Sequence, residues 1–175
     1  MLIKMNAIMK LEIESAANFI THLANIARND DDIDGYKLHK FNLKLQDVMT
    51  EKYSKTWNED DPWYGSGRRI IRTLDEKSEL ARGHSVILEA ALQSKICPDE
   101  IYSRMPFELT IWINPGLVTY RIFDFYFDLY DGSKDEKSWT PKTPIYRSPN
   151  DKEDFDYSVY ENSIRTDDEN NYDCI

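Results

Sequence analysis

The sequence contains no apolar run that approaches the roughly 20 residues needed to cross a bilayer. Residues 1–10 are apolar, but this stretch is short and interrupted by Lys4, which argues against a signal peptide. Only two cysteines are present, Cys97 and Cys174, and their wide separation argues against a disulfide framework and predicts free thiols. The sequence therefore predicts a protein of the cytosol or nucleus that does not bind membranes.

Basic residues are outnumbered: 22 Lys and Arg stand against 32 Asp and Glu, for a net charge of −10. This balance argues against a protein that wraps nucleic acid, so we expect no direct nucleic-acid binding. His22, His39 and His84 form no H-x-x-x-H spacing and the cysteines no C-x-x-C spacing, so we expect no catalytic site, metal or cofactor. A hydrolase that uses Ser66 or Cys97 is the least favoured alternative, because neither residue has an identifiable catalytic partner.

What the sequence does contain is the apolar spacing of helices. Apolar residues recur every three or four positions over 9–27 and again over 36–55, and residues 85–96 also have helical character. A short helix follows with Pro98 in its first turn, where the missing N–H costs nothing. Residues 68–74 are a strand candidate, and we interpret the preceding "YGSG" as an entry into an edge strand rather than a phosphate-binding loop.

Three further strands are predicted over 107–113, 117–122 and 125–130, and the first two flank an Asn-Pro-Gly turn. Alternation in the first strand places Ile111 and Ile113 on one face and Trp112 on the other. Two interpretations of that tryptophan carry equal weight: it faces a partner, or a helix or the third of these strands covers it. The element order predicts an α+β fold in which N-terminal helices pack on a small antiparallel sheet that includes a C-terminal β-hairpin.

The last part of the chain differs in composition. Residues 133–175 contain 11 Asp and Glu against 6 Lys and Arg, with few aliphatic residues, which predicts an acidic, disordered tail. We therefore divide the chain into an N-terminal extension (1–8), a globular domain (9–132) and the tail (133–175). Thr140, Thr143 and Ser148 each precede a proline and are candidate phosphorylation sites, with simple turn residues as the alternative interpretation.

Four segments resemble the BTG/Tob antiproliferative family in order and spacing. They are "MKLEIESAANFITHL", "KLHKFNLKLQDVMTEKYSKTW", "GSGRRIIR" and "MPFELTIWINPGLVTYRI". The second resembles the family's box A, here residues 41–62, and the fourth resembles box B, here residues 105–124. The resemblance covers residues 9–130 and implies a compact domain of helices on an antiparallel sheet.

The resemblance also implies a function. Family members are non-enzymatic adaptors that bind the poly(A) deadenylase subunit of the Ccr–Not complex and promote mRNA deadenylation and translational repression, in the cytoplasm and nucleus. Poly(A)-binding protein or transcription factors are further candidate partners, although the tail lacks a Leu-Asn-Pro-x-Ala motif. The alternative is a scaffold or transcriptional co-regulator with the same fold that self-associates or makes other protein contacts without deadenylase binding.

The partner-binding residues that the resemblance implies are Trp112, Asn114, Pro115, Lys52 and Arg68. Lys52 fits the family pattern. Asn114 stands where the family usually has Asp, and a neutral hydrogen bond is worth about 1 kcal/mol against about 1.5–3 kcal/mol for a charged one. Arg68 stands where the family has an aromatic ring, so apolar contact is lost. Gly116 is expected to shorten and loosen the turn that follows box B's tryptophan.

Overall fold

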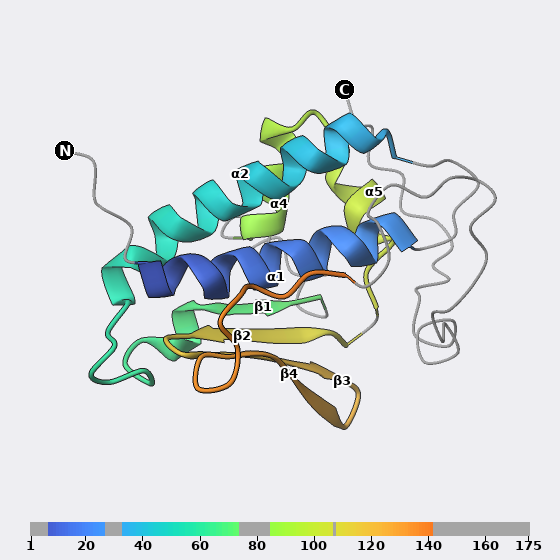
Figure 1. The fold of residues 1–175 in the computed structure, drawn as a ribbon. Helices are drawn as coiled ribbons and strands as arrows, with labels where there is room; N and C mark the ends of the chain where they lie inside the picture. Colours follow the sequence, from blue (N-terminus) through green and yellow to red (C-terminus); the bar gives the residue numbers. More distant parts are fainter. Residues whose placement is uncertain (1–6, 27–32, 74–84, 107, 142–175) are drawn as a thin grey trace.

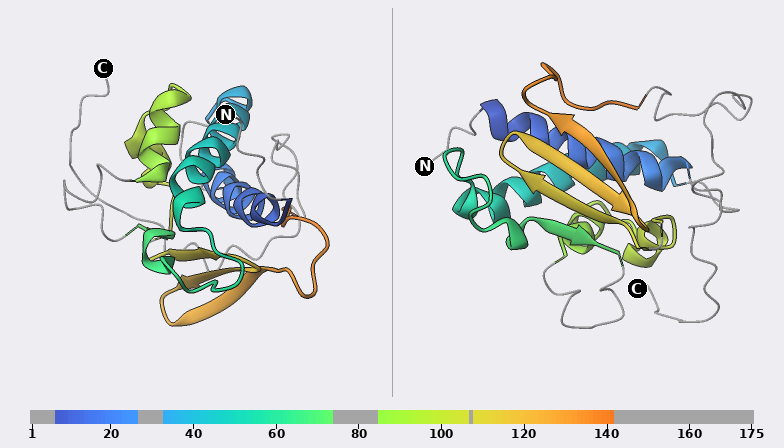
Figure 2. Two further views of the ribbon diagram at one scale, coloured as in Figure 1. Left: turned by 90° about the vertical axis from the view of Figure 1, so that its left-hand side faces the viewer. Right: turned by 90° about the horizontal axis from the view of Figure 1, so that it is seen from below.

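The computed structural model describes residues 7–26, 33–73, 85–106 and 108–141. Its helices lie on one face of a four-stranded antiparallel sheet, so the domain has two layers (Figures 1 and 2). The strands follow the order β1-β2-β3-β4, where β1 is Ile70–Arg72, β2 is Thr110–Asn114, β3 is Leu117–Ile122 and β4 is Phe125–Asp131. The predicted α+β class is confirmed, and so is the interpretation of "YGSG" as an entry into an edge strand.

The described helices are α1 (Ala7–Ile26), α2 (Gly35–Tyr53), α4 (Val86–Gln93) and α5 (Pro98–Tyr102), with two short 3₁₀ segments, η1 (Ser54–Thr56) and η2 (Ser66–Arg68). Side-chain caps fix two helix starts, since Asp34 accepts from the Lys37 amide and Ser85 from the Leu88 amide. The third predicted helix ends early because Lys95 adopts a left-handed φ of 59°. None of the described helices is long and apolar enough to cross a bilayer.

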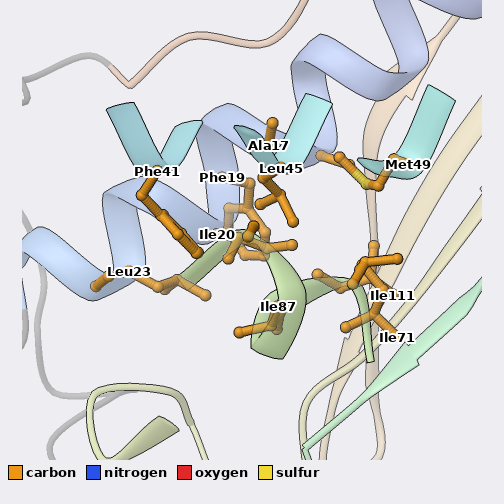
Figure 3. Packing of buried hydrophobic residues seen from close by; sticks show 14 of the residues in the cluster. Ala17, Phe19, Ile20, Leu23, Phe41, Leu45, Met49, Ile71, Ile87 and Ile111 are labelled. Atoms are coloured by element: carbon orange, nitrogen blue, oxygen red, sulfur yellow. The ribbon is translucent and has the colours of Figure 1, made fainter. Parts of the chain in front are cut away.

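The core lies between α1 and the sheet and continues between the helices. Helix α1 contacts β2, β3 and β4, while α2 packs on both α1 and α4. Figure 3 shows Ile20 of α1, Leu45 of α2, Ile87 of α4 and Ile111 of β2 gathered in one buried cluster. Full burial of each such side chain contributes roughly 1.5–3 kcal/mol. The apolar spacing that predicted the first helix therefore marks its buried face, as the burial of Ile13, Ala16, Ile20 and Leu23 confirms.

After β4 the chain returns to the helical layer and lies along α1 (Figure 1). The Trp139 amide donates to Ser15 Oγ over 2.7 Å, and Asn18 Nδ2 donates to the Trp139 carbonyl over 2.9 Å. The indole also meets the Phe19 ring edge-on, with centroids 5.5 Å apart. The described beginning of the predicted tail thus packs on the domain, while residues 142–175 lie outside the described part.

Cys97 precedes α5 and is disulfide-bonded. The prediction of a free thiol is therefore wrong at this position, because separation along the chain does not limit proximity in space. Cys174 lies outside the described residues.

A fully buried cation, Arg69, connects the 57–65 loop to the sheet. On the loop side, Nη2 donates to the Pro62 carbonyl over 2.8 Å and Nη1 donates to the Tyr64 carbonyl over 3.0 Å. Nη1 also donates to the carbonyl and hydroxyl oxygens of Thr56. The loop is therefore held at several points of its backbone by one guanidinium group.

The same guanidinium holds the end of β2. Nε donates to the Ile113 carbonyl over 2.9 Å, and Nη2 donates to Asn114 Oδ1 over 3.1 Å. These acceptors are all neutral oxygens, and burial lowers the pKa of Arg69. The Trp57 ring lies 5.6 Å from Cζ and adds a cation–π contact. The side chain thus remains a cation that is solvated by the protein rather than by water.

Glu12 of α1 is buried beneath the turn that follows β2. Its Oε1 accepts from the Gly116 amide over 2.7 Å, while its Oε2 has no hydrogen-bond partner among the described residues. Burial raises the pKa of this carboxyl to about 7, and the charge of Glu59 adds to the increase. The carboxyl in turn contributes to the raised pKa of the Tyr130 hydroxyl. Glu12 is therefore close to half-protonated at neutral pH.

Replacing Asn114 by Asp is expected to stabilise the fold by about 1 kcal/mol at pH 7, because a carboxylate forms a charge-assisted bond with the buried guanidinium. Urea unfolding measures the change. Asn58→Asp is the control, since it adds the same charge to an acidic protein without meeting Arg69. A destabilisation by Asn114→Asp that matches the control would contradict this assignment.

The free energy of unfolding should fall as the pH rises from about 4.5 through 7, because the folded protein binds the Glu12 proton more tightly than the unfolded chain does. The loss attributable to Glu12 is on the order of 3 kcal/mol across this window. Urea unfolding of wild type and Glu12→Gln between pH 4 and 8 isolates the contribution as the difference between the two curves. Parallel curves would show that Glu12 does not titrate in this range.

Candidate functional site

Two of the predicted partner-binding residues, Asn114 and Pro115, lie at the corner where β2 turns into β3, which Gly116 completes. Gly116 has a φ of +78°, which favours glycine over other residues. Its amide donates to Glu12 and its carbonyl accepts from the Gly132 amide over 2.9 Å. One buried side chain and one backbone hydrogen bond therefore anchor this turn.

Trp112 lies on the face of the sheet opposite the helices, between Ile70 of β1 and Thr119 of β3 in the strand register. All four described α-helices lie on the other face of the sheet (Figure 2), and the side chain is partly buried. Its ring stacks on Tyr126 with centroids 6.0 Å apart, and the Arg121 guanidinium lies 6.0 Å from the indole and 5.8 Å from the phenol. We call Trp112, Arg121 and Tyr126 the outer cluster.

The outer cluster bears on both interpretations of the tryptophan, because Tyr126 of the third predicted strand stacks on the ring. The helical layer does not cover the ring. The ring rests against Tyr126 and keeps part of its surface open to water. Aromatic rings and arginines are the side chains most often found at the centres of protein interfaces. The cluster therefore offers a partner a ring supported by its neighbours.

Arg68 is exposed in η2 and immediately precedes Arg69. Two residues later, Ile70 of β1 lies opposite Trp112 in the strand register. Gly65, with a φ of +67°, starts this segment. A Cβ there would lie 2.8 Å from Thr56 Cβ, so the close approach requires glycine. The basic side chain of Arg68 is thus presented at the same end of the sheet as the corner.

The remaining predicted residues differ in accessibility. Asn114 and Pro115 are buried, and the Asn114 side chain accepts from Arg69, so these two residues shape the corner from inside. Lys52 is partly exposed at the end of α2, where its Nζ lies 2.8 Å from Glu89 Oε2. A half-exposed pair of this kind contributes at most about 1 kcal/mol, so exchange for a partner's carboxylate would cost little.

Sequence reasoning missed the two buried charges that hold this corner. A helical-spacing signal existed for Glu12, which lies three residues after Met9 and four before Ala16 on the buried face of α1. No comparable pattern singled out Arg69, because an arginine in a short edge strand is ordinarily solvent-exposed. The outer cluster's Arg121 and Tyr126 were likewise hidden, since their contact depends on the strand register.

Of the candidate phosphorylation sites, Thr140 is exposed next to Trp139, while Thr143 and Ser148 lie outside the described residues. Within the described ranges, no group of three or more His, Cys, Asp and Glu side chains is arranged to hold a metal ion.

Comparison of the sequence with known proteins identifies the family of this chain. The model of the BTG family matches residues 9–125. The chain is similar to Protein BTG2 of Rattus norvegicus, with 32% identity over 111 residues that cover 63% of this chain and 65% of the relative. It is also similar to Protein Tob1 of Homo sapiens, with 31% identity over 115 residues that cover 65% of this chain and 30% of that one. The matched region spans less than two thirds of these relatives' length.

Among solved structures, the fold is similar to a double variant of the BTG/Tob domain of C. elegans FOG-3, with a TM-score of 0.57 and 20% identity. The match covers 69% of this chain and 89% of that domain, and at this identity it supports the fold alone. Since the family model covers most of the chain, from α1 to the start of β4, this protein belongs to the BTG family.

Proposed function

We propose that this protein is a non-enzymatic, antiproliferative adaptor that binds the poly(A) deadenylase subunit of the Ccr–Not complex. By bringing the deadenylase to messenger RNA, it promotes deadenylation and translational repression in the cytoplasm and nucleus. Poly(A)-binding protein or transcription factors are the further partners proposed. Membership of the BTG family supports an adaptor role of this kind.

The observation that carries the proposal is the position of Trp112, partly exposed on the face of the sheet that the helices leave open. An indole buries a large area at low entropic cost, and the stacked Tyr126 limits the orientations it can adopt before binding. In the proposed complex Trp112 inserts into the partner and Arg68 contacts the partner beside it. Lys52 exchanges its Glu89 pair for a partner carboxylate, and Asn114 and Pro115 hold the corner in shape.

A second candidate function is a scaffold that self-associates. It is favoured by β4, one of the two edge strands of the described sheet, where Phe125, Tyr126 and Phe127 are 67%, 62% and 43% exposed. Asp124 and Asp128 are also exposed along this strand, and like charges would meet if two copies paired there. Growth of particle size with concentration in light scattering, together with no affinity for the deadenylase, would select this function instead.

Trp112→Ala is expected to weaken deadenylase binding by roughly 30-fold or more, the loss of about 2 kcal/mol that defines an interface hot spot. Calorimetric titration of the purified deadenylase subunit measures the affinity, and circular dichroism confirms that the variant is folded. The control is Tyr36→Ala, which removes a 73% exposed ring at the far end of α2 and should leave binding unchanged.

Absence of binding by the wild type would end the deadenylase proposal. Equal affinity of Trp112→Ala and wild type would remove Trp112 from the site while leaving the proposed partner in place.

A further inference from the structure

The loop of residues 57–65, which leads from η1 to η2, exposes two adjacent aromatic side chains. Trp63 is 68% exposed and Tyr64 is 61% exposed. Neither is needed to fill the core, and both leave large apolar surface in water. Adjacent exposed apolar side chains of this kind can mark an interaction site. The two rings therefore need an explanation beyond the stability of the fold.

The backbone that carries these rings is fixed. The buried Arg69 guanidinium binds the backbone carbonyls of Pro62 and Tyr64, the two residues that flank Trp63. Within the loop, the Tyr64 amide donates to the Asp61 carbonyl over 3.0 Å, and the Ser66 amide donates to the Trp63 carbonyl over 3.1 Å. A partner that binds the rings therefore does not have to order the chain that carries them.

The loop also lies beside the candidate site. Arg69 Nη2 donates both to the Pro62 carbonyl and to Asn114 Oδ1, so the loop backbone and the corner share one donor atom. Figure 1 shows the loop at the end of the sheet where β2 turns into β3. A partner that approaches this end of the sheet to reach Trp112 would meet the loop as well.

The charge in front of the rings points to the character of the partner. Glu59, Asp60 and Asp61 are exposed and directly precede Pro62. The Asn58 side chain accepts from the amides of Asp60 and Asp61, which keeps this acidic turn closed. An apolar pair beside three carboxylates complements an apolar recess with a rim of lysine or arginine side chains.

We propose that Trp63 and Tyr64 form a second anchor for the partner that covers Trp112, and that this partner presents a basic rim to Glu59, Asp60 and Asp61. The inference rests on the proposed function and takes the deadenylase subunit as that partner. The recognition surface then extends from the open face of the sheet across the corner to the loop.

The test measures binding of the purified deadenylase subunit to the full chain carrying Trp63→Ala, Tyr64→Ala or both. Each single variant should lower the affinity, and the double variant should lower it by roughly 10-fold or more. Tyr36→Ala, which removes an exposed ring at the other end of α2, should bind as wild type does. Because both rings are exposed, the thermal midpoint of unfolding should be unchanged. Asp60→Asn with Asp61→Asn should slow association and flatten its dependence on salt.

The outcomes separate the two proposals. If wild type binds, Trp112→Ala weakens binding and the Trp63 and Tyr64 variants bind normally, the second anchor is refuted and the adaptor function stands. If wild type does not bind, both are lost. If the double aspartate variant associates at the wild-type rate with the same salt dependence, the partner has no basic rim at this loop.

Discussion

The geometry of this domain's recognition surface depends on the solvation of one buried cation by backbone oxygens. Arg69 is sealed from water, and no ion pair compensates it among the described residues, so its N–H groups must find acceptors inside the protein. An unsatisfied buried donor costs about 1–3 kcal/mol, and more when it is charged. The 57–65 loop and the end of β2 supply those acceptors. Their shared contact with Arg69 holds the loop against the end of the strand. A side chain without exposed surface thus positions the exposed residues Trp63, Tyr64 and Arg68.

A second buried charge acts on the same corner from the opposite layer. Glu12 reaches from α1 to the Gly116 amide, so the turn after β2 is tied to the helical layer as Arg69 ties it to the loop. The two charges differ in how they respond to pH. An arginine stays charged, whereas the raised pKa of Glu12 places its protonation change near neutrality. The Gly116 hydrogen bond favours the ionised carboxylate whereas burial favours the protonated form, so the contribution of Glu12 to the corner changes with pH and that of Arg69 does not.

Much of the fold was predictable because it follows from local periodicity. The spacing of Ile13, Ile20 and Leu23 predicted α1, and Asn-Pro-Gly between two alternating strands predicted the hairpin with β3 at its observed bounds. Asn114 lies two residues after Trp112, so alternation gives both the same face, yet Asn114 is buried. A residue at the end of a strand can instead be covered by what packs on that end, here Arg69 and the loop. Periodicity also could not predict whether Trp112 is exposed. A ring that faces a partner and a ring that another element covers give the same alternation along the strand. Arg69 and Glu12 were missed for a related reason: sequence patterns assign charged residues to solvent, and their burial arises only from tertiary contacts.

The most direct measurement is the affinity of Arg69→Lys for the deadenylase subunit, made under conditions in which unfolding curves show the variant to be folded. Lysine keeps the charge but lacks the planar fork that bridges loop and strand. If Arg69 sets the geometry of the surface, the buried substitution should weaken binding by at least roughly 10-fold while touching no partner atom. Wild-type affinity in a folded Arg69→Lys protein would contradict the account, because the surface would then keep its shape without the interaction held to define it.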